Sequence, residues 1–103
     1  MKRIFRSDTF ITWLKKLNDS KAKSIIALRI SRLRNGNTGD VKPIGENCSE
    51  MRIHYGQGYR VYYKDTSTGI AILLCGGGKS TQQKDIAKAK EIAKLPLDEF
   101  TED

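Results

Sequence analysis

The segment SEMRIHYGQGYRVYY, residues 49–63, limits the possible folds more than any other part of the chain. Apolar residues alternate with polar, mostly basic ones on both sides of a glycine-containing turn, and the apolar set is Met51, Ile53, Tyr55, Tyr59, Val61 and Tyr63. Alternation with a period of two is the pattern of a β-strand whose two faces differ. The segment therefore predicts a β-hairpin with one apolar and one basic face.

The register of this hairpin follows from its two apolar sets, which share a face only if paired residue numbers add to an even value. A three-residue loop, Gly56-Gln57-Gly58, meets this condition. It places His54 opposite Arg60 and Arg52 opposite Tyr62. Directly opposed side chains lie about 5 Å apart, so this register gathers four groups able to bind phosphate or transfer protons.

The other elements follow from local patterns. Residues 2–6 are predicted as a strand, followed by a helix capped by Ser7 or Asp8 that carries an apolar stripe at helical spacing, Phe10, Trp13, Leu14 and Leu17. A second helix over residues 21–35, started by Asp19 or Ser20, forms an antiparallel hairpin with the first. Its apolar arc is Ala22, Ile25, Ile26, Ile30 and Leu33, with Arg29 inside it, either as a partner contact or as a stem lying over the core edge.

The second half is predicted to complete the sheet and add a last helix. Residues 41–44 are predicted as an edge strand because of Pro43, and residues 70–75, which do not alternate, as a central strand covered on both faces. A capping box of Ser80 and Gln83 starts a helix over residues 81–95. The chain is thus expected to be α+β, one domain over residues 1–95 with four or five mostly antiparallel strands, and a short, mobile acidic tail over residues 96–103.

The string GGGKST, residues 76–81, invites comparison with a phosphate-binding P-loop. That motif needs a glycine six residues before its lysine, but the position six residues before Lys79 is Leu73. We therefore interpret the string as a strand-to-helix joint whose lysine and helix N-terminus can still meet a phosphate of a larger ligand.

Charge and composition suggest the kind of partner. The 103 residues carry a net charge of +7, and the excess lies in residues 1–79, with 15 Lys and Arg against 6 Asp and Glu. Such an excess favours a polyanion, nucleic acid first, although a basic surface without a specific partner has the same composition. Cys48 and Cys75 lack metal-ligand spacing and are interpreted as packing thiols. The N-terminal segment has no apolar signal region, which favours the cytosol, and no metal or cofactor is expected.

The strings GYRVYY and GGGKSTQQKDI, with the order strand, helical hairpin, antiparallel strands and helix, closely resemble the RelE/ParE toxin superfamily. Within it, they resemble the phage-derived, HigB-like branch known as addiction module killer proteins. The resemblance implies the toxin of a type II toxin–antitoxin pair, neutralised by an antitoxin with a helix-turn-helix domain. RelE-like members cut mRNA on the ribosome, whereas ParE-like members poison DNA gyrase; an inactive, antitoxin-binding remnant is a third possibility.

The resemblance also suggests site residues. Arg60 matches the arginine of the GYR motif, and Arg52 lies where RelE-like members place basic catalytic residues. His54 is the natural general acid or base because its ordinary pKa is near neutrality. The last helix has no Tyr or His, so Tyr62 is the substitute proton donor. The residues expected to bind RNA phosphate are Lys64, Lys79 and Gln82.

Four of these residues also have a structural interpretation. Arg60 is equally suited to pair with Glu50 or Asp85, and Tyr62 to be an ordinary strand residue. His54 and Lys79 are both residue types that commonly lie solvated at the surface.

Overall fold

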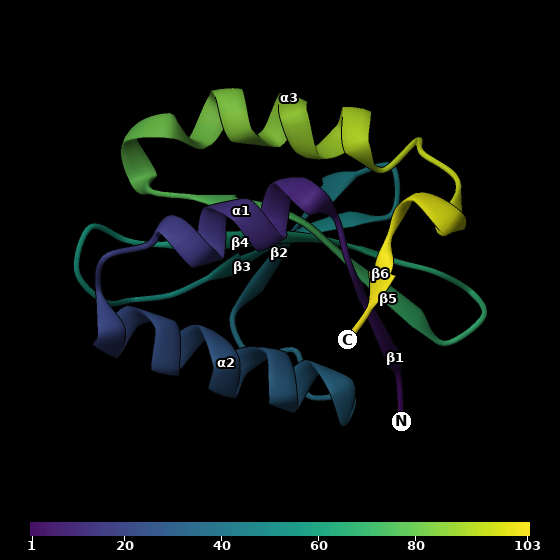
Figure 1. Cartoon of the computed structure of the whole chain (residues 1–103), viewed down its shortest axis with the longest axis horizontal. Coiled ribbons are helices and arrows are strands. Elements are labelled where there is room, and N and C mark those ends of the chain that lie inside the picture. The colour runs from purple at the N-terminus through teal and green to yellow at the C-terminus, as the bar shows by residue number, and fades with distance from the viewer.

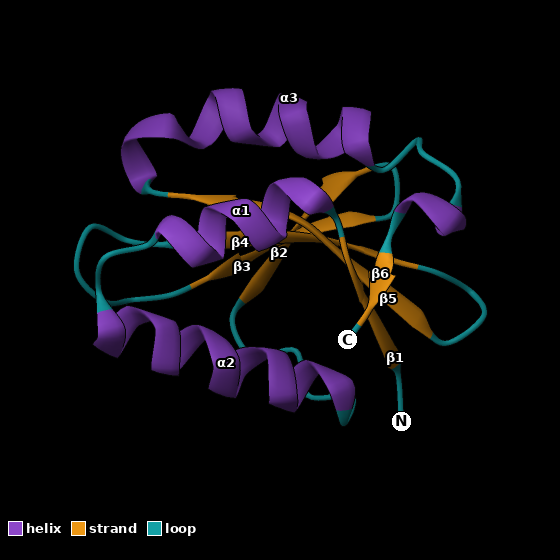
Figure 2. Cartoon of the chain, viewed as in Figure 1, coloured by secondary structure: helices purple, strands orange, loops and turns teal.

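The computed structural model describes residues 1–103 and has three α-helices and one six-stranded sheet (Figures 1 and 2). The helices are α1 (Asp8–Lys16), α2 (Ser20–Arg34) and α3 (Gln82–Ile92). The strands are β1 (Arg3–Arg6), β2 (Val41–Gly45), β3 (Cys48–Arg52), β4 (Arg60–Asp65), β5 (Ile70–Gly77) and β6 (Thr101–Glu102). The sheet order is β2-β3-β4-β5-β1-β6, and only the β1–β5 pair is parallel. The α+β class is confirmed, but the sheet has six strands where four or five were predicted.

The sheet is covered by helices on both faces, with α3 on one side and α2 on the other (Figure 1). The first core joins the apolar sides of α1 and α2 to the odd-numbered hairpin residues Met51, Ile53, Tyr59, Val61 and Tyr63. The second core joins α3 to the opposite face of the sheet through Ala89 and Ala93. Strand β5 is buried on both faces from Ile70 to Cys75. Its predicted central position is confirmed.

The starts of the first two helices agree with the predicted caps. The Ser7 hydroxyl accepts a hydrogen bond from the Phe10 amide at 3.0 Å, and the Asp19 carboxylate accepts one from the Ala22 amide at 3.0 Å. Each cap satisfies an amide that the first turn of a helix leaves without a partner. The boundaries of α1 and α2 were therefore readable from local sequence.

The start of α3 differs from its prediction. Residues Lys79–Thr81 form a 3₁₀ turn, and no capping box involving Ser80 is present. Instead, the Thr81 hydroxyl donates to the Asp85 carboxylate at 2.5 Å. The helix packs Ile86, Ala89 and Ala93 on the sheet as its apolar spacing predicts, buries Asp85 as well, and leaves Ala87 exposed.

The predicted register of the β3–β4 hairpin is wrong by two residues of one strand relative to the other. Arg52 pairs with Arg60 and Glu50 with Tyr62, while the Ile53 amide donates to the Tyr59 carbonyl at 2.8 Å. The loop therefore has five residues, 54–58, where three were predicted. Both registers bury the same apolar set, so alternation could not choose between them.

Residues 96–103 are not the loose segment that was expected. Phe100 is buried, and β6 pairs antiparallel with β1 at the edge of the sheet. Asp103 accepts ion pairs from Arg6 at 2.9 Å and Arg34 at 2.7 Å. The acidic composition of this segment is therefore matched to basic side chains near the edge of the sheet, beside β1.

The glycines of the GGGKST string allow close packing between the elements. A methyl group on Gly76 would overlap the Trp13 ring, one on Gly77 would overlap the Asp85 carboxylate, and one on Gly78 would lie 2.6 Å from the Gln57 side-chain oxygen. None of the three needs a positive φ. The string is thus a strand-to-helix joint in which helices and a loop approach the backbone directly.

Candidate phosphate-binding site

A pocket of about 510 Å³ lies at the end of the β3–β4 hairpin, between its loop and the joint that follows β5. Its lining combines four basic or titratable side chains with the glycine-rich loop: Arg52, His54, Arg60, Lys79 and residues 55–58, together with Ile53. Four of the seven expected site residues therefore line this pocket, and three of the four, Arg52, Arg60 and Lys79, are cationic. A pocket with this lining is suited to an anion.

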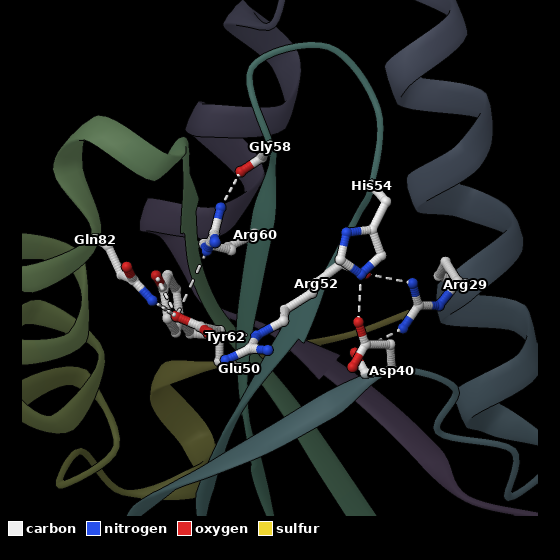
Figure 3. A network of polar contacts seen from close by, with 9 residues as sticks. All are labelled: Arg29, Asp40, Glu50, Arg52, His54, Gly58, Arg60, Tyr62 and Gln82. Atoms are coloured by element: carbon white, nitrogen blue, oxygen red, sulfur yellow. Dashed lines mark hydrogen bonds and ion pairs between the residues drawn. The ribbon is translucent and has the colours of Figure 1, made fainter.

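The buried carboxylate of Glu50 organises the base of this pocket (Figure 3). Its Oε1 accepts a hydrogen bond from Arg52 Nε at 3.1 Å, and its Oε2 accepts one from Gln82 Nε2 at 2.7 Å and one from the Tyr62 hydroxyl at 3.2 Å. Arg60 Nε lies 3.7 Å from Oε2, which is an ion pair. The pairing of Arg60 with Glu50 confirms one of the two structural interpretations of this arginine.

These contacts decide the protonation of Glu50. Burial by itself would raise the pKa of the carboxyl, but the hydrogen bonds from Gln82, Arg52 and Tyr62 and the charge of Arg60 outweigh burial and hold the pKa below its ordinary value. Glu50 is therefore ionised at neutral pH. One buried negative charge thus contacts the two guanidinium groups that line the pocket.

Arg52 and Arg60 are directly opposed on neighbouring strands. The side chain of Arg52 is 32% exposed and that of Arg60 13% exposed. Arg60 also donates from Nη1 to the Gly58 carbonyl at the end of the hairpin loop. Two guanidinium groups so placed suit the two or more oxygens of a phosphate.

His54 lies beyond the last residue of β3 and not opposite Arg60 as predicted. Its ring contacts the carboxylate of Asp40, in the turn before β2. The hydrogen bond from His54 lowers the pKa of the Asp40 carboxyl. Arg29 braces this corner by donating to the carbonyls of Asp40 and Arg52, at 3.1 and 2.6 Å (Figure 3). The side chain of His54 is 75% exposed, so it is accessible at the rim of the pocket.

Three expected site residues lie elsewhere or act indirectly. Tyr62 is fully buried, and burial together with the Glu50 charge raises its pKa well above the usual range. It therefore neither contacts a ligand nor acts as a base at neutral pH. Gln82 donates to Glu50 and not into the pocket. Lys64 donates to the Ala93 carbonyl at the end of α3, away from the pocket.

The sequence reasoning missed Asp40 and assigned Glu50 only as a possible partner of Arg60. A signal for Glu50 was available, because it shares the even-numbered strand face with Arg52 and Tyr62. No local signal linked Asp40 to His54, since these residues meet only when β2 folds onto β3. The two cysteines are buried thiols, and burial raises the pKa of Cys75 to about 12.

No cluster of three His, Cys, Asp or Glu side chains suited to a metal ion occurs in the structure. None of the helices combines the length and the apolar character needed to cross a membrane.

Comparison with solved structures identifies the fold. The structure is similar to that of the E. coli toxin RelE, solved in the free state as a double arginine-to-alanine variant. The TM-score is 0.67 over 92% of this chain and 100% of that chain, at 13% sequence identity. This identity is low enough that the similarity shows the fold alone. The chain is thus a protein with the RelE fold and a basic pocket at the end of its central hairpin.

The sequence relationship is closer for another protein. An uncharacterized protein of Haemophilus influenzae is 53% identical over 85 residues, which are 82% of this chain and 86% of that protein. The chain belongs to the same family as this Haemophilus protein. No family model matches the chain.

Proposed function

We propose that the chain is the toxin of a type II toxin–antitoxin pair, in the HigB-like branch of the RelE/ParE superfamily, and that it cleaves mRNA on the ribosome. The RelE fold supports the first part, since the similar structure is that of a toxin. The net charge of +7 and the basic pocket support an RNA substrate. The protein would act in the cytoplasm, and a helix-turn-helix antitoxin would neutralise it.

The observation that carries the nuclease proposal is the opposed pair Arg52 and Arg60 at the base of an open pocket. RNA cleavage requires stabilisation of the charge that develops on the phosphate in flight. The two guanidinium groups would supply it, and Lys79, which is exposed at the rim, would hold a flanking phosphate.

Proton transfer is assigned to His54. Cleavage also needs a base for the ribose 2′-hydroxyl and an acid for the leaving 5′-oxygen. His54 is the exposed pocket residue whose ordinary pKa is near neutrality, and Asp40 would orient its ring. Tyr62, the other candidate, is buried and serves Glu50 in this proposal.

A second function is favoured by the scarcity of proton-transfer groups. Helix α3 carries no Tyr or His, and Tyr62 is buried, so His54 stands alone in the pocket. A ParE-like gyrase poison needs no such chemistry. Its induction would provoke a DNA-damage response before translation falls. An inactive remnant that only binds its antitoxin would cause neither effect.

The testing experiment is induction of the protein in bacterial cells, with mapping of new mRNA 5′ ends within minutes. The variant Arg52→Ala is preferred to the double variant with Arg60→Ala, because Glu50 then keeps Arg60 as its cation. Loss of both arginines would leave a buried charge unpaired, which costs about 3–5 kcal/mol. Arg32→Ala is the matched control, since it removes the same charge from an exposed position on α2.

New ends in translated frames that disappear in Arg52→Ala and persist in Arg32→Ala are the expected result. Growth arrest without new mRNA ends would contradict the nuclease proposal and make gyrase the next target to test.

A further inference from the structure

An acidic residue in contact with the two arginines of the proposed phosphate site is unexpected, because its charge repels a phosphate. Glu50 is nevertheless completely buried there, and it is one of only three buried polar or charged residues in the molecule. A buried carboxylate of this kind is kept only where its contacts offset the cost of removing it from water. The contacts that offset this cost for Glu50 are those with Arg52 and Arg60.

Without Glu50, the placement of Arg52 and Arg60 would be unfavourable. Arg52 and Arg60 are directly opposed across the β3–β4 ladder, where like charges repel. Arginine side chains are also flexible, so two of them without a partner would spread over many rotamers. A phosphate would then have to order both side chains and overcome their repulsion when it binds.

The contacts of Glu50 remove both costs. Oε1 accepts from Arg52 Nε, and Oε2 is paired with Arg60 Nε. Arg52 is therefore held by a hydrogen bond at Nε, and Arg60 by an ion pair at Nε together with its hydrogen bond from Nη1 to the Gly58 carbonyl. The two Nη groups of Arg52 make no hydrogen bond to the protein in this structure, so they are left for a ligand.

The carboxylate is itself held by neutral donors. Gln82 Nε2, from the first turn of α3, and the Tyr62 hydroxyl, from β4, both donate to Oε2. These donors add no charge, and they fix the orientation of Glu50 between β4 and α3. The arrangement resembles the outer partners that orient the ligands of a metal site.

We propose that Glu50 is a positioning residue that holds Arg52 and Arg60 as a preformed pair for a phosphate group, with Gln82 and Tyr62 as its supports. The identity of this phosphate as part of RNA rests on the function proposed above. The pair itself is a property of the folded chain, and it is testable without ribosomes, RNA or toxicity.

The test is a titration of the folded protein with inorganic phosphate, followed by NMR of the arginine Nε–H groups. Simple Coulomb reasoning predicts that Glu50→Gln binds phosphate more tightly, because a negative charge is removed. If Glu50 positions the two arginines, the affinity should fall instead. Glu50→Gln should then bind phosphate about tenfold more weakly, which is the scale on which residues that orient metal ligands affect binding. Glu91→Gln, an exposed glutamate on α3, is the control for the same change in net charge.

Gln82→Leu is the second variant, and it keeps the Glu50 charge while removing one support. Gln82→Leu should also weaken phosphate binding, but by a smaller factor than Glu50→Gln. In an Arg52→Ala background, Glu50→Gln should lose most of its effect, because the pair no longer exists. A purely structural role for Glu50 would leave its effect unchanged in that background.

Equal or tighter phosphate binding by folded Glu50→Gln would overturn the proposal, as would wild-type protein that binds no phosphate in the pocket. If Glu50→Gln does not fold, unchanged binding by Gln82→Leu would overturn it instead. Absence of mRNA cleavage in cells, with phosphate binding as expected here, would contradict the nuclease proposal and leave the role of Glu50 standing.

Discussion

The two faces of the β3–β4 hairpin are built from the same strands, but one forms an apolar core and the other a polar network. The odd-numbered face buries Met51, Ile53 and Val61 under α1 and α2, in a core without charge. The even-numbered face, beneath α3, buries Glu50 and Tyr62 and holds two arginines at the edge of a pocket. One face is packed by apolar contacts, whereas the other is a polar network of hydrogen bonds and ion pairs centred on Glu50.

The difference lies in how each face is stabilised. Apolar packing is non-directional, so its contribution follows the area buried. A buried polar network contributes only if its donors and acceptors are matched, and loss of one member leaves the others unsatisfied. We therefore expect substitutions on the first face to change stability alone. Substitutions on the second face should change both stability and ligand binding.

The largest expected effect is on the apolar face. Phe10→Ala removes a fully buried ring from the α1 side of the core, and truncation of a buried Phe costs about 3–5 kcal/mol. Urea unfolding measures this loss. The protein that remains folded should bind phosphate as wild type does, because Phe10 does not line the pocket. Weakened binding by folded Phe10→Ala would show that the two faces are coupled.

A smaller loss is expected at the joint between β5 and α3. In Gly77→Ala the new methyl group would overlap the Asp85 carboxylate, and overpacking of this kind costs about 1–3 kcal/mol. The same substitution in an Asp85→Ala background should cost clearly less, because the overlapping group is gone. Equal costs in both backgrounds, measured by thermal unfolding, would mean that the close approach of Asp85 is not what requires glycine.

Acid should weaken the polar face selectively. The folded-state pKa of Glu50 lies below its ordinary value of 4.5, so the ionised carboxylate contributes stability that is fully present above the unfolded-state pKa. That contribution is lost as the pH falls through the folded-state pKa. Urea unfolding of wild type and Glu50→Gln between about pH 7 and pH 3 should show a shallower acid-side slope for the variant. Parallel profiles would mean that folding does not lower the pKa of Glu50.

The smallest change in the free energy of unfolding is expected for His54→Ala, within about 0.5 kcal/mol, because an exposed side chain is removed. Its effect on function should be large. Loss of a general acid or base reduces the rate by about 10²- to 10⁴-fold, measured as mRNA cleavage on purified ribosomes. Asp40→Asn keeps the His54 imidazole but weakens its orientation, so its cleavage rate should lie between those of wild type and His54→Ala. Undiminished cleavage by His54→Ala would remove His54 from the proposed chemistry.

The degree to which the structure was readable from the sequence differs between local and long-range features. The caps at Ser7 and Asp19 and the buried run of β5 were predicted correctly, since each depends on neighbours within a few residues. The hairpin register was wrong because two loop lengths bury the same side chains. The edge strand β6 was missed because its partner strand, β1, is at the opposite end of the chain.

By itself, the sequence determined the elements from β1 to α3, the α+β class and the basic character of the central hairpin, because periodicity, capping and net charge are local or additive properties. Only the tertiary structure decided which groups meet. It paired Arg52 with Arg60, placed Glu50 between them, buried Tyr62 and brought Asp40 to His54. The physical reason is that a polar site depends on pairing across strands and helices. A shift of two residues in that pairing changes every partner and leaves the apolar face the same.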